Sequence, residues 1–571
     1  MRLKGSEIAC EALLREGVDV LFGYPGGAVL PFYDALYKYQ DRLRHILVRH
    51  EQSAAHAANA YYRVSGRMGV CVATSGPGAT NLVTGLMDAK ADSVPLVAIT
   101  GQVARPFMGK EAFQECPTVD ITAPCTKKNY LVMSASDVAP TLYDAFRTAV
   151  DGRPGPVLVD LPRDVQQEEA EFEYPINPPA PNHMALSPEA LKNLRRAALL
   201  LAQAKRPLIL AGHGVLISRA WDELLALAER INVPVINTLL GLTSFPRNHR
   251  LSLGMLGMHG MYWCNQAVDQ ADVILGLGMR FDDRVTGRPG TFAPNAQIVH
   301  VDVEPKNIGR NVRVEVPVVA DLKAALQALL PMVGQAAPNN KDWLEQIEAW
   351  KRDHNSLYVP EDVELPAQYV LSELNKLLQE DREAVVTTGV GQHQMWSAQF
   401  LFLDRPNSFV TSGSLGTMGF ELPSAVGAQV GRPDSTVWSI AGDGGFQMSM
   451  HELATMVEHE LPVKIVIMNN RHLGMVRQWQ DMFYDKHIKE TPLMNPDFVK
   501  LADAFGIPAV RVTRREDVSP ALRRARAHRG PFLLEMVVEP EGCVFPMVAP
   551  GKTLAETMED PRSVVVARAT S

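Results

Sequence analysis

Two oxygen-bearing side chains follow neighbouring apolar strands in the stretch WSIAGDGGFQMSMHELATMVEHELPVKIVIMNN. Asp443 lies in a GDG turn after the first strand, and Asn470 ends the second strand beyond a helical pattern. The two strands of such a βαβ unit point the same way, so both side chains are expected at one edge of a sheet. Hard oxygen ligands there suit Mg²⁺, which usually takes the rest of its shell from phosphates and water. Gly442 and Gly444 would let backbone N–H groups approach those phosphates at the start of the helix.

A carboxyl group at the start of another helix is the second candidate for chemistry. Glu51 follows the apolar strand HILVRH and begins a small-residue helix, AAHAANA. A carboxyl held at such a junction inside an apolar layer is expected to resist ionisation and to share a proton. The residue pattern alone also fits an exposed glutamate that interacts favourably with the helix dipole.

Apolar strands alternate with helical patterns along almost the whole chain, and these elements must position both sites. Runs such as VPLVAITG, GPVLVDLP and ADVILGLG are apolar throughout, which is typical of parallel strands covered by helices on both faces. Two polar, Pro-rich stretches divide the chain into three segments of similar size. We therefore predict an α/β fold with three doubly wound parallel-sheet domains. The predicted domains span residues 1–167, 190–335 and 366–545, with a C-terminal tail over 546–571.

Length, composition and charge exclude several classes of protein. The 571 residues exceed what one core usually organises, and 46% hydrophobic with 21% charged residues is ordinary for a globular chain. A net charge of −8 without blocks of one sign argues against a nucleic-acid binder. Six scattered cysteines without a C-x-x-C pair indicate neither a disulfide framework nor a zinc site of that type. No apolar run approaches the ~20 residues of a membrane span, and the opening residues read as an amphipathic helix, so we expect a cytoplasmic protein with no membrane or nucleic-acid partner.

The spacing of GDG and NN resembles the signature of the thiamin-diphosphate-dependent enzymes, and further stretches agree along the whole chain. The chain is most similar to the catalytic large subunits of the acetohydroxyacid synthase, or acetolactate synthase, family. The matching stretches are FGYPGGAVLPFYDAL, RHEQSAAHAANAY, TSGPGATN, TGQV, GRPGPVLVDLPRDVQ, GMLGMHG, RFDDRVTGR, GTMGFELPSA and GMVRQWQ. The resemblance implies a pyrimidine-binding first domain, a central FAD-binding domain and a third domain that binds the diphosphate and Mg²⁺.

The resemblance also assigns roles around the thiamin. Glu51 would be the catalytic glutamate that contacts aminopyrimidine N1′ and promotes formation of the ylid. Gln102 in TGQV would be an active-site glutamine, and Gly27 in PGGA would give the backbone close access to cofactor or substrate. Met418 in GTMGF would support the bent shape of the cofactor, beside the phosphate turn of Gly442 and Gly444. The implied metal ligands, the last of them through its main-chain carbonyl rather than its imidazole, are Asp443, Asn470 and His472.

The middle segment resembles the flavin domain of the same family. Its GHG turn (212–214) lacks the full G-x-G-x-x-G fingerprint, so an NAD dehydrogenase is the inferior interpretation. The resemblance implies FAD in a structural, non-redox role, lying across residues 259–280 and 302–321. Either Arg280 or Arg284 offers a guanidinium suited to the carboxylate of a 2-oxo acid; we assign Arg284 to substrate and leave open a contact from Arg280. The implied FAD contacts are Arg153, His259, Gly260, Arg280, Asp302 and Asp321.

The implied activity is that of an acetohydroxyacid synthase in branched-chain amino-acid biosynthesis. Pyruvate would be decarboxylated on thiamin diphosphate, and the hydroxyethyl group joined to pyruvate, giving 2-acetolactate, or to 2-oxobutanoate, giving 2-aceto-2-hydroxybutyrate. Trp479 would favour 2-oxobutanoate as the acceptor. The family further implies a homodimer or homotetramer with active sites between chains, and a small regulatory subunit.

Three alternatives compete with this interpretation. A flavin-using pyruvate oxidase is the nearest, but RFDDRVTG and GMVRQWQ favour the synthase. Glyoxylate carboligase lacks the glutamate that this chain has at position 51. A noncatalytic flavin- or nucleotide-binding protein would be expected to have lost at least one of Glu51, Asp443 and Asn470.

Overall fold

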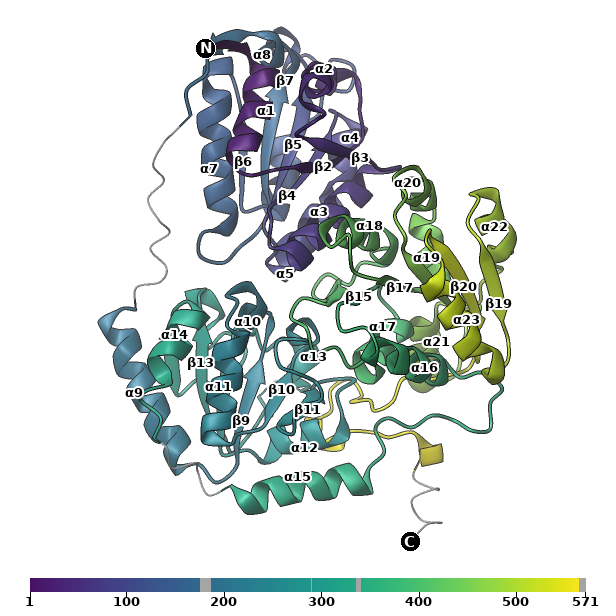
Figure 1. Ribbon diagram of the computed structural model, residues 1–571. Coiled ribbons are helices and arrows are strands. Elements are labelled where there is room, and N and C mark those ends of the chain that lie inside the picture. The colour runs from purple at the N-terminus through teal and green to yellow at the C-terminus, as the bar shows by residue number, and fades with distance from the viewer. Residues whose placement is uncertain (175–185, 289, 335–339, 564–571) are drawn as a thin grey trace.

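Three six-stranded sheets follow one another in the computed structural model, which describes residues 1–174, 186–288, 290–334 and 340–563 (Figure 1). Neighbouring strands within each of these sheets are parallel. The predicted α/β fold of three doubly wound domains is thereby confirmed. Each sheet lies within one predicted segment; the segment boundaries stay predictions, and the end of the predicted C-terminal tail lies outside the described residues.

The first sheet has the strand order β3-β2-β4-β5-β7-β6 and is covered by helices on both faces. Alternate residues of one strand enter two different cores: Val70 and Val72 pack with α1, α2 and α7, whereas Cys71 and Ala73 pack with α3 and α5. Burial of both faces explains why these strands are apolar throughout. The elements are β1 (Arg2–Lys4), α1 (Gly5–Arg15), β2 (Val20–Gly23), α2 (Leu30–Tyr39), β3 (Arg44–Leu47), α3 (Glu51–Ser65), β4 (Gly69–Ala73), α4 (Pro77–Asn81), α5 (Val83–Asp92), β5 (Leu96–Gln102), α6 (Thr118–Thr122), β6 (Lys128–Leu131), α7 (Val138–Val150), β7 (Val157–Pro162), α8 (Arg163–Gln167) and β8 (Glu169–Glu171).

The second sheet has the order β11-β10-β9-β12-β13-β14. The ends of β9 and β12 approach each other so closely that a Cβ on Gly278 would lie 2.5 Å from Gly214 Cα, and Gly278 has φ +57°. Only glycine tolerates both conditions, so this loop pair explains the GHG turn. The elements are α9 (Pro188–Gln203), β9 (Pro207–Ala211), α10 (His213–Ile217), α11 (Trp221–Ile231), β10 (Val235–Asn237), β11 (Ser252–Met255), α12 (Tyr262–Gln270), β12 (Val273–Leu277), α13 (Asp283–Thr286), β13 (Gln297–Asp302), β14 (Val316–Val319), α14 (Leu322–Leu329) and α15 (Lys341–Asp353).

The third sheet has the order β16-β15-β17-β18-β20-β19. After β20 the chain returns to the middle domain, where Val548 N donates to Met258 O at 2.8 Å and Ala555 O accepts from Gln266. The elements are α16 (Ala367–Gln379), β15 (Val385–Thr388), α17 (Gln392–Phe400), β16 (Phe409–Thr411), α18 (Glu421–Gly431), β17 (Val437–Gly442), α19 (Asp443–Ser449), α20 (Glu452–Glu458), β18 (Lys464–Asn469), α21 (Gly474–Phe483), α22 (Phe498–Ala504), β19 (Ala509–Val512), α23 (Arg515–Ala527) and β20 (Phe532–Val537).

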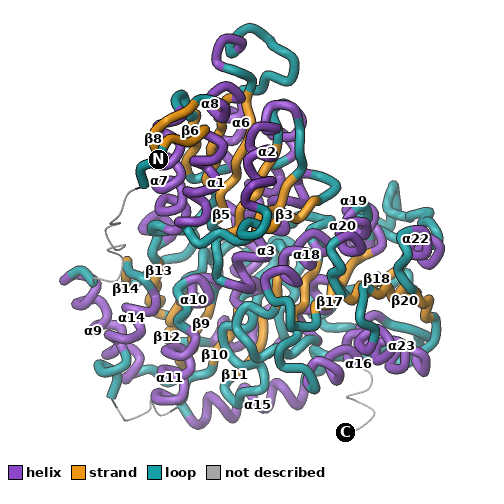
Figure 2. Tube along the Cα trace, turned by 45° about the horizontal axis from the view of Figure 1, so that its top comes forward, coloured by secondary structure: helices purple, strands orange, loops and turns teal. Residues whose placement is uncertain are grey.

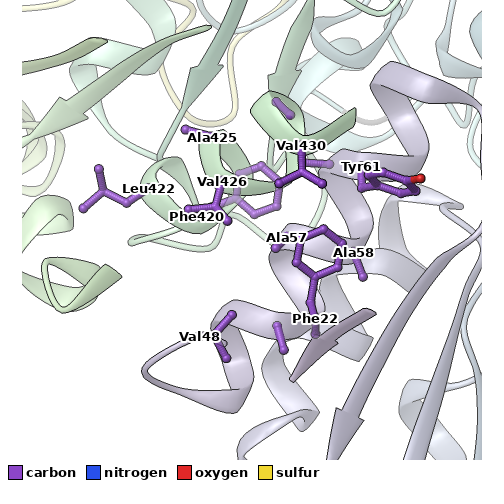
Figure 3. Close-up of a cluster of buried hydrophobic side chains, with 14 of the residues drawn as sticks. Phe22, Val48, Ala57, Ala58, Tyr61, Phe420, Leu422, Ala425, Val426 and Val430 are labelled. Carbon is purple, nitrogen blue, oxygen red and sulfur yellow. The ribbon is translucent and has the colours of Figure 1, made fainter. Parts of the chain in front are cut away.

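Helix α3 of the first domain packs directly on α18 of the third (Figures 2 and 3). Their backbones come so close that a Cβ on Gly427 would lie 2.0 Å from Ala57 O. Phe22 and Tyr61 from one domain and Phe420 from the other belong to one continuous hydrophobic core. The first and third domains therefore share a core. None of the described helices combines the length and apolar character that crossing a membrane requires.

Candidate active site

A cavity of about 1450 Å³ is lined by residues of all three domains. Ordinary small-molecule pockets measure about 300–1,000 Å³, so this one is large enough for a dinucleotide together with a further small ligand. It brings together most of the residues that the sequence assigned to FAD and to substrate. The predicted residues that line it are Arg153, His259, Arg280, Arg284, Asp302, Asp321, Met418 and Trp479.

Two guanidinium groups converge on one side of the cavity. Arg153 donates to Ala91 O at 3.3 Å, and Arg280 donates to the same oxygen at 3.4 Å and to Ser414 Oγ at 2.6 Å. Burial and the neighbouring charge of Arg280 lower the pKa of Arg153. Two cations held this close favour an anionic ligand, such as the phosphates of a dinucleotide.

Acidic residues line the same side of the cavity as the two arginines, where Asp282 forms an ion pair with Arg280 at 3.4 Å. Asp302 ends β13 and accepts from Glu304 N at 2.8 Å, and Asp321 caps α14 by accepting from Ala324 N at 3.0 Å. Asp282 also lines the cavity, and its buried Oδ1 has no hydrogen-bond partner within the described residues. The unpaired Oδ1 of Asp282 suits a hydroxyl or amine donor of a flavin dinucleotide, so the residues present fit FAD.

Gly260 lies beside this cavity rather than among the residues that line it. A Cβ there would meet the Leu256 carbonyl carbon at 2.4 Å, so the glycine serves the close packing of the backbone next to His259. His259 itself is buried, with Nδ1 3.3 Å from Pro546 O, and burial lowers its pKa to about 4. A neutral imidazole therefore lines the cavity.

The cavity reaches the predicted substrate residues at its other end. The Arg284 guanidinium lies 6.0 Å from the centre of the Trp479 ring, and the Arg284 side chain is 63% exposed. Met418 lines the same cavity and lies beside the GDG turn, where a Cβ on Gly444 would be 3.7 Å from Met418 Cε. An exposed cation beside an indole face can hold the carboxylate of a small acid against an apolar wall.

The predicted metal ligands lie together at the carboxyl edge of the third sheet. Gly442 of β17 is paired with Met468 of β18, so Asp443 and Asn470 leave the sheet side by side. Asp443 Oδ2 accepts from Asn495 at 2.7 Å, and burial raises the pKa of Asp443 to about 6. A buried carboxylate whose ionised form is disfavoured gains most from a cation. The residues present therefore fit Mg²⁺.

Other features of this edge limit how the metal could be held. The described residues contain no group of three or more His, Cys, Asp and Glu side chains that could bind a metal. Mg²⁺ usually takes the rest of its shell from phosphate oxygens and water. The imidazole of His472 turns back to its own chain, with Nδ1 2.9 Å from Asn470 O, while His472 N donates to Asn470 Oδ1. The imidazole of His472 is therefore engaged by its own chain, and the predicted carbonyl contribution stays a prediction.

His393 is a candidate that the sequence reasoning missed. It is buried beside the GDG turn, where a Cβ on Gly442 would lie 2.8 Å from its Nδ1, and its Nε2 has no partner within the described residues. Its pKa is lowered to about 3 by burial. A neutral imidazole N–H at this position suits a phosphate oxygen. The available signal was the glycine turn TGVGQH after the apolar strand β15.

Glu51, Gln102 and Gly27 are not among the described residues that line the cavity in one chain. Glu51 begins α3, is half-buried and accepts from Asn81 Nδ2 at 2.9 Å. Gln102 is buried, and its amide donates to Cys116 O and to Asp160 at 2.8 and 3.0 Å. Gly27 is exposed, and a Cβ there would meet nothing within 4 Å. The roles predicted for these three residues stay predictions.

Comparison with known families agrees with this arrangement of three domains. The N-terminal TPP binding domain of the thiamine pyrophosphate enzymes matches residues 3–123, their central domain matches 194–329, and their C-terminal TPP binding domain matches 389–536. The three domains are thus those of a thiamine pyrophosphate enzyme.

Comparison with individual proteins identifies the family within this class of enzymes. The chain is 45% identical to the acetolactate synthase large subunit of Mycobacterium tuberculosis, over 96% of this chain and 90% of that protein. It is 44% identical to the acetolactate synthase large subunit of Corynebacterium glutamicum, over 97% and 89% of the two chains, and 44% identical to the chloroplastic acetolactate synthase 1 of rice, over 98% and 88%. The chain belongs to the acetolactate synthase family.

Proposed function

We propose that the protein is an acetohydroxyacid synthase. It decarboxylates pyruvate and joins the resulting hydroxyethyl group to pyruvate, giving 2-acetolactate, or to 2-oxobutanoate, giving 2-aceto-2-hydroxybutyrate. The observation that supports this most strongly is the single cavity that runs from the flavin-sized region past Arg284 and Trp479 to Met418, in a chain of this family. These products are precursors of the branched-chain amino acids.

Thiamin diphosphate, Mg²⁺ and FAD are the proposed cofactors. Bound thiamin supplies the electron sink for decarboxylation, and the protein supplies position, proton transfer and exclusion of water. Asp443 and Asn470 would hold Mg²⁺ together with the carbonyl of His472, and His393 would donate to a diphosphate oxygen. FAD would occupy the flank of the cavity formed by Arg153, Arg280, Asp302 and Asp321, in a structural role.

Three side chains carry the proposed chemistry of the protein itself. Glu51 would hold a proton at N1′ of the aminopyrimidine, a step of general acid–base type that typically contributes about 10²- to 10⁴-fold to the rate. Arg284 would bind the carboxylate of the 2-oxo acid, and Trp479 would line the pocket for the acceptor's alkyl group. Gln102 and Gly27 would lie on the first-domain side of the same site.

A second copy of the chain is part of this proposal. Glu51 does not line the cavity of its own chain, so the first domain of one chain would face the third domain of another. Phe113 and Met494 are 88% and 98% exposed, as expected of apolar residues that a partner covers. The proposed assembly is a homodimer or homotetramer, and a small regulatory subunit is suggested by relatives named as large subunits. The six cysteines are unpaired, which suits the reducing cytoplasm.

One experiment tests the activity. The purified protein is incubated with thiamin diphosphate, Mg²⁺, FAD and pyruvate, and the product is identified by mass spectrometry. We expect acetolactate and carbon dioxide. Acetate with consumption of oxygen would instead indicate a pyruvate oxidase, and no turnover in the folded, cofactor-loaded protein would reject both enzymes.

A further inference from the structure

Helix α20 of the third domain lies against the end of β3 in the first domain, just before Glu51 (Figure 1). β3 is an edge strand whose neighbour is β2, so its outer main-chain groups lack partners in the sheet. Side chains of the helix provide those partners. Leu47 N donates to His459 Nε2 at 3.0 Å, and Leu47 O accepts from Thr455 Oγ1 at 3.2 Å.

Glu452, at the start of α20, extends this contact to both sides of Glu51. Its side chain is fully buried, and Oε1 accepts from Arg49 N at 2.9 Å. Oε2 lies 2.6 Å from Thr455 Oγ1, whose single hydroxyl proton is shared between this oxygen and Leu47 O. Burial raises the pKa of Glu452, and the Ser53 side chain is among the nearby groups that oppose this rise. One buried carboxyl group thus interacts with the residue two places before Glu51 and the residue two places after it.

The contacts come from one face of the helix. Glu452, Thr455 and His459 are separated by three and four positions, which places them on one side of an α-helix. Glu452 and Thr455 each hydrogen-bond the first domain and also each other. These shared hydrogen bonds fix the orientation of both side chains. Arg49 also forms an ion pair with Glu458 on the exposed side of the same helix. Side chains of α20 therefore hold the main chain at residues 47 and 49, in addition to the sheet contact in which Val48 N donates to Gly23 O at 3.3 Å.

We propose that Glu452 is a positioning residue, which fixes the backbone around Glu51 so that the Glu51 carboxyl keeps its direction toward the aminopyrimidine. This inference rests on the proposed function of Glu51. The Glu452 side chain would not touch the cofactor; it would act through the turn that carries the catalytic group. Rates of this kind are sensitive to geometry, since a misplacement of about 1 Å can cost about 10²-fold.

The test measures exchange of the thiamin C2 proton for deuterium in the cofactor-saturated protein. We expect Glu452→Ala to slow exchange about 10- to 100-fold while the affinity for thiamin diphosphate and the KM for pyruvate change little. Glu452→Gln keeps an oxygen acceptor for Arg49 N and should restore most of the rate. Glu458→Ala is the matched control, because it removes only the exposed ion pair with Arg49 and should change exchange by less than about threefold.

A double substitution separates positioning from general damage. If Glu452 acts through Glu51, adding Glu452→Ala to Glu51→Gln should cause no further loss of exchange. Equal fold losses in both backgrounds, or normal exchange in a folded Glu452→Ala protein, would overturn the inference. If Glu452→Ala does not fold, Thr455→Val is the substitute, because it removes the contacts to Leu47 O and to Glu452 and should slow exchange several-fold. Normal exchange in the Thr455→Val protein would also overturn the inference. Normal exchange in Glu51→Gln alone would reject the proposed role of Glu51 and this inference with it.

Discussion

Replacing Arg63 by methionine should destabilise the protein far more than the same change at Arg67, just beyond the same helix. Arg63 donates to Asp92 at 2.8 Å, with side chains only 5% and 0% exposed. Its Nη1 also donates to Thr411 O at 2.9 Å, so one guanidinium joins α3, α5 and the third domain. Arg67 pairs instead with Asp19, and both of those side chains are about half exposed, at 45% and 49%.

The difference in magnitude follows from burial. Without Arg63, the Asp92 carboxylate keeps only neutral donors, among them the N–H groups of Gly413 and Ser414 at 3.0 and 2.8 Å. Burial by itself would raise the pKa of Asp92, but Arg63 and these N–H groups hold it below its ordinary value. Removing one partner of such a pair costs about 3–5 kcal/mol. An exposed pair contributes about 0–1 kcal/mol, so Arg67→Met should be nearly neutral.

Thermal unfolding of the cofactor-loaded protein measures this difference in stability between the two variants. We expect Arg63→Met to lower the midpoint by several degrees and Arg67→Met to leave it almost unchanged. Because Ser414 also contacts Arg280 in the cavity wall, Arg63→Met should release bound flavin more readily. Equal midpoints for the two variants would refute the reasoning, since they would show that the buried pair contributes no more than an exposed one.

Three further predictions follow from the site and the core. Asp443→Ala should weaken the binding of Mg²⁺ and thiamin diphosphate together and spare FAD, as measured by titration with each cofactor; unchanged affinity for thiamin would reject Asp443 as a ligand. Trp479→Leu should keep acetolactate formation but lower the preference for 2-oxobutanoate several-fold, since one methylene is worth about 1–3 kcal/mol in an apolar pocket; competition between the two acceptors measures this, and an unchanged product ratio would leave Trp479 a structural role. Burial raises the pKa of Asp160 to about 7, against about 3.9 in the unfolded chain, so the folded state binds this proton more tightly and loses stability as pH rises from about 4 to about 7. Asp160→Asn should therefore show a smaller fall of the unfolding midpoint over that range, and an identical pH profile would contradict the assignment.

The sequence by itself determined the fold class and the sheet edge at which the predicted metal ligands lie. Continuous apolar strands alternating with helices require a parallel sheet covered on both faces, and Val70 to Ala73 pack in just this way. The position of Asp443 beside Asn470 was also predictable, because the carboxyl ends of neighbouring parallel strands share one edge. In both cases the information is local: a strand, a turn and a helix of one βαβ unit contain it.

Only the tertiary structure decided which residues far apart in the chain meet. His393 has no motif that distinguishes it from a core histidine, and its role follows from burial next to Gly442 with one nitrogen unpaired. The absence of Glu51 from the cavity lining, and the contact of Glu452 with Arg49 N more than four hundred residues away, depend on how α3 packs against α18 and the end of β3 against α20. Such contacts are fixed by the shapes of packed surfaces rather than by spacing along the chain, because side chains from distant segments become neighbours only when the domains share a core.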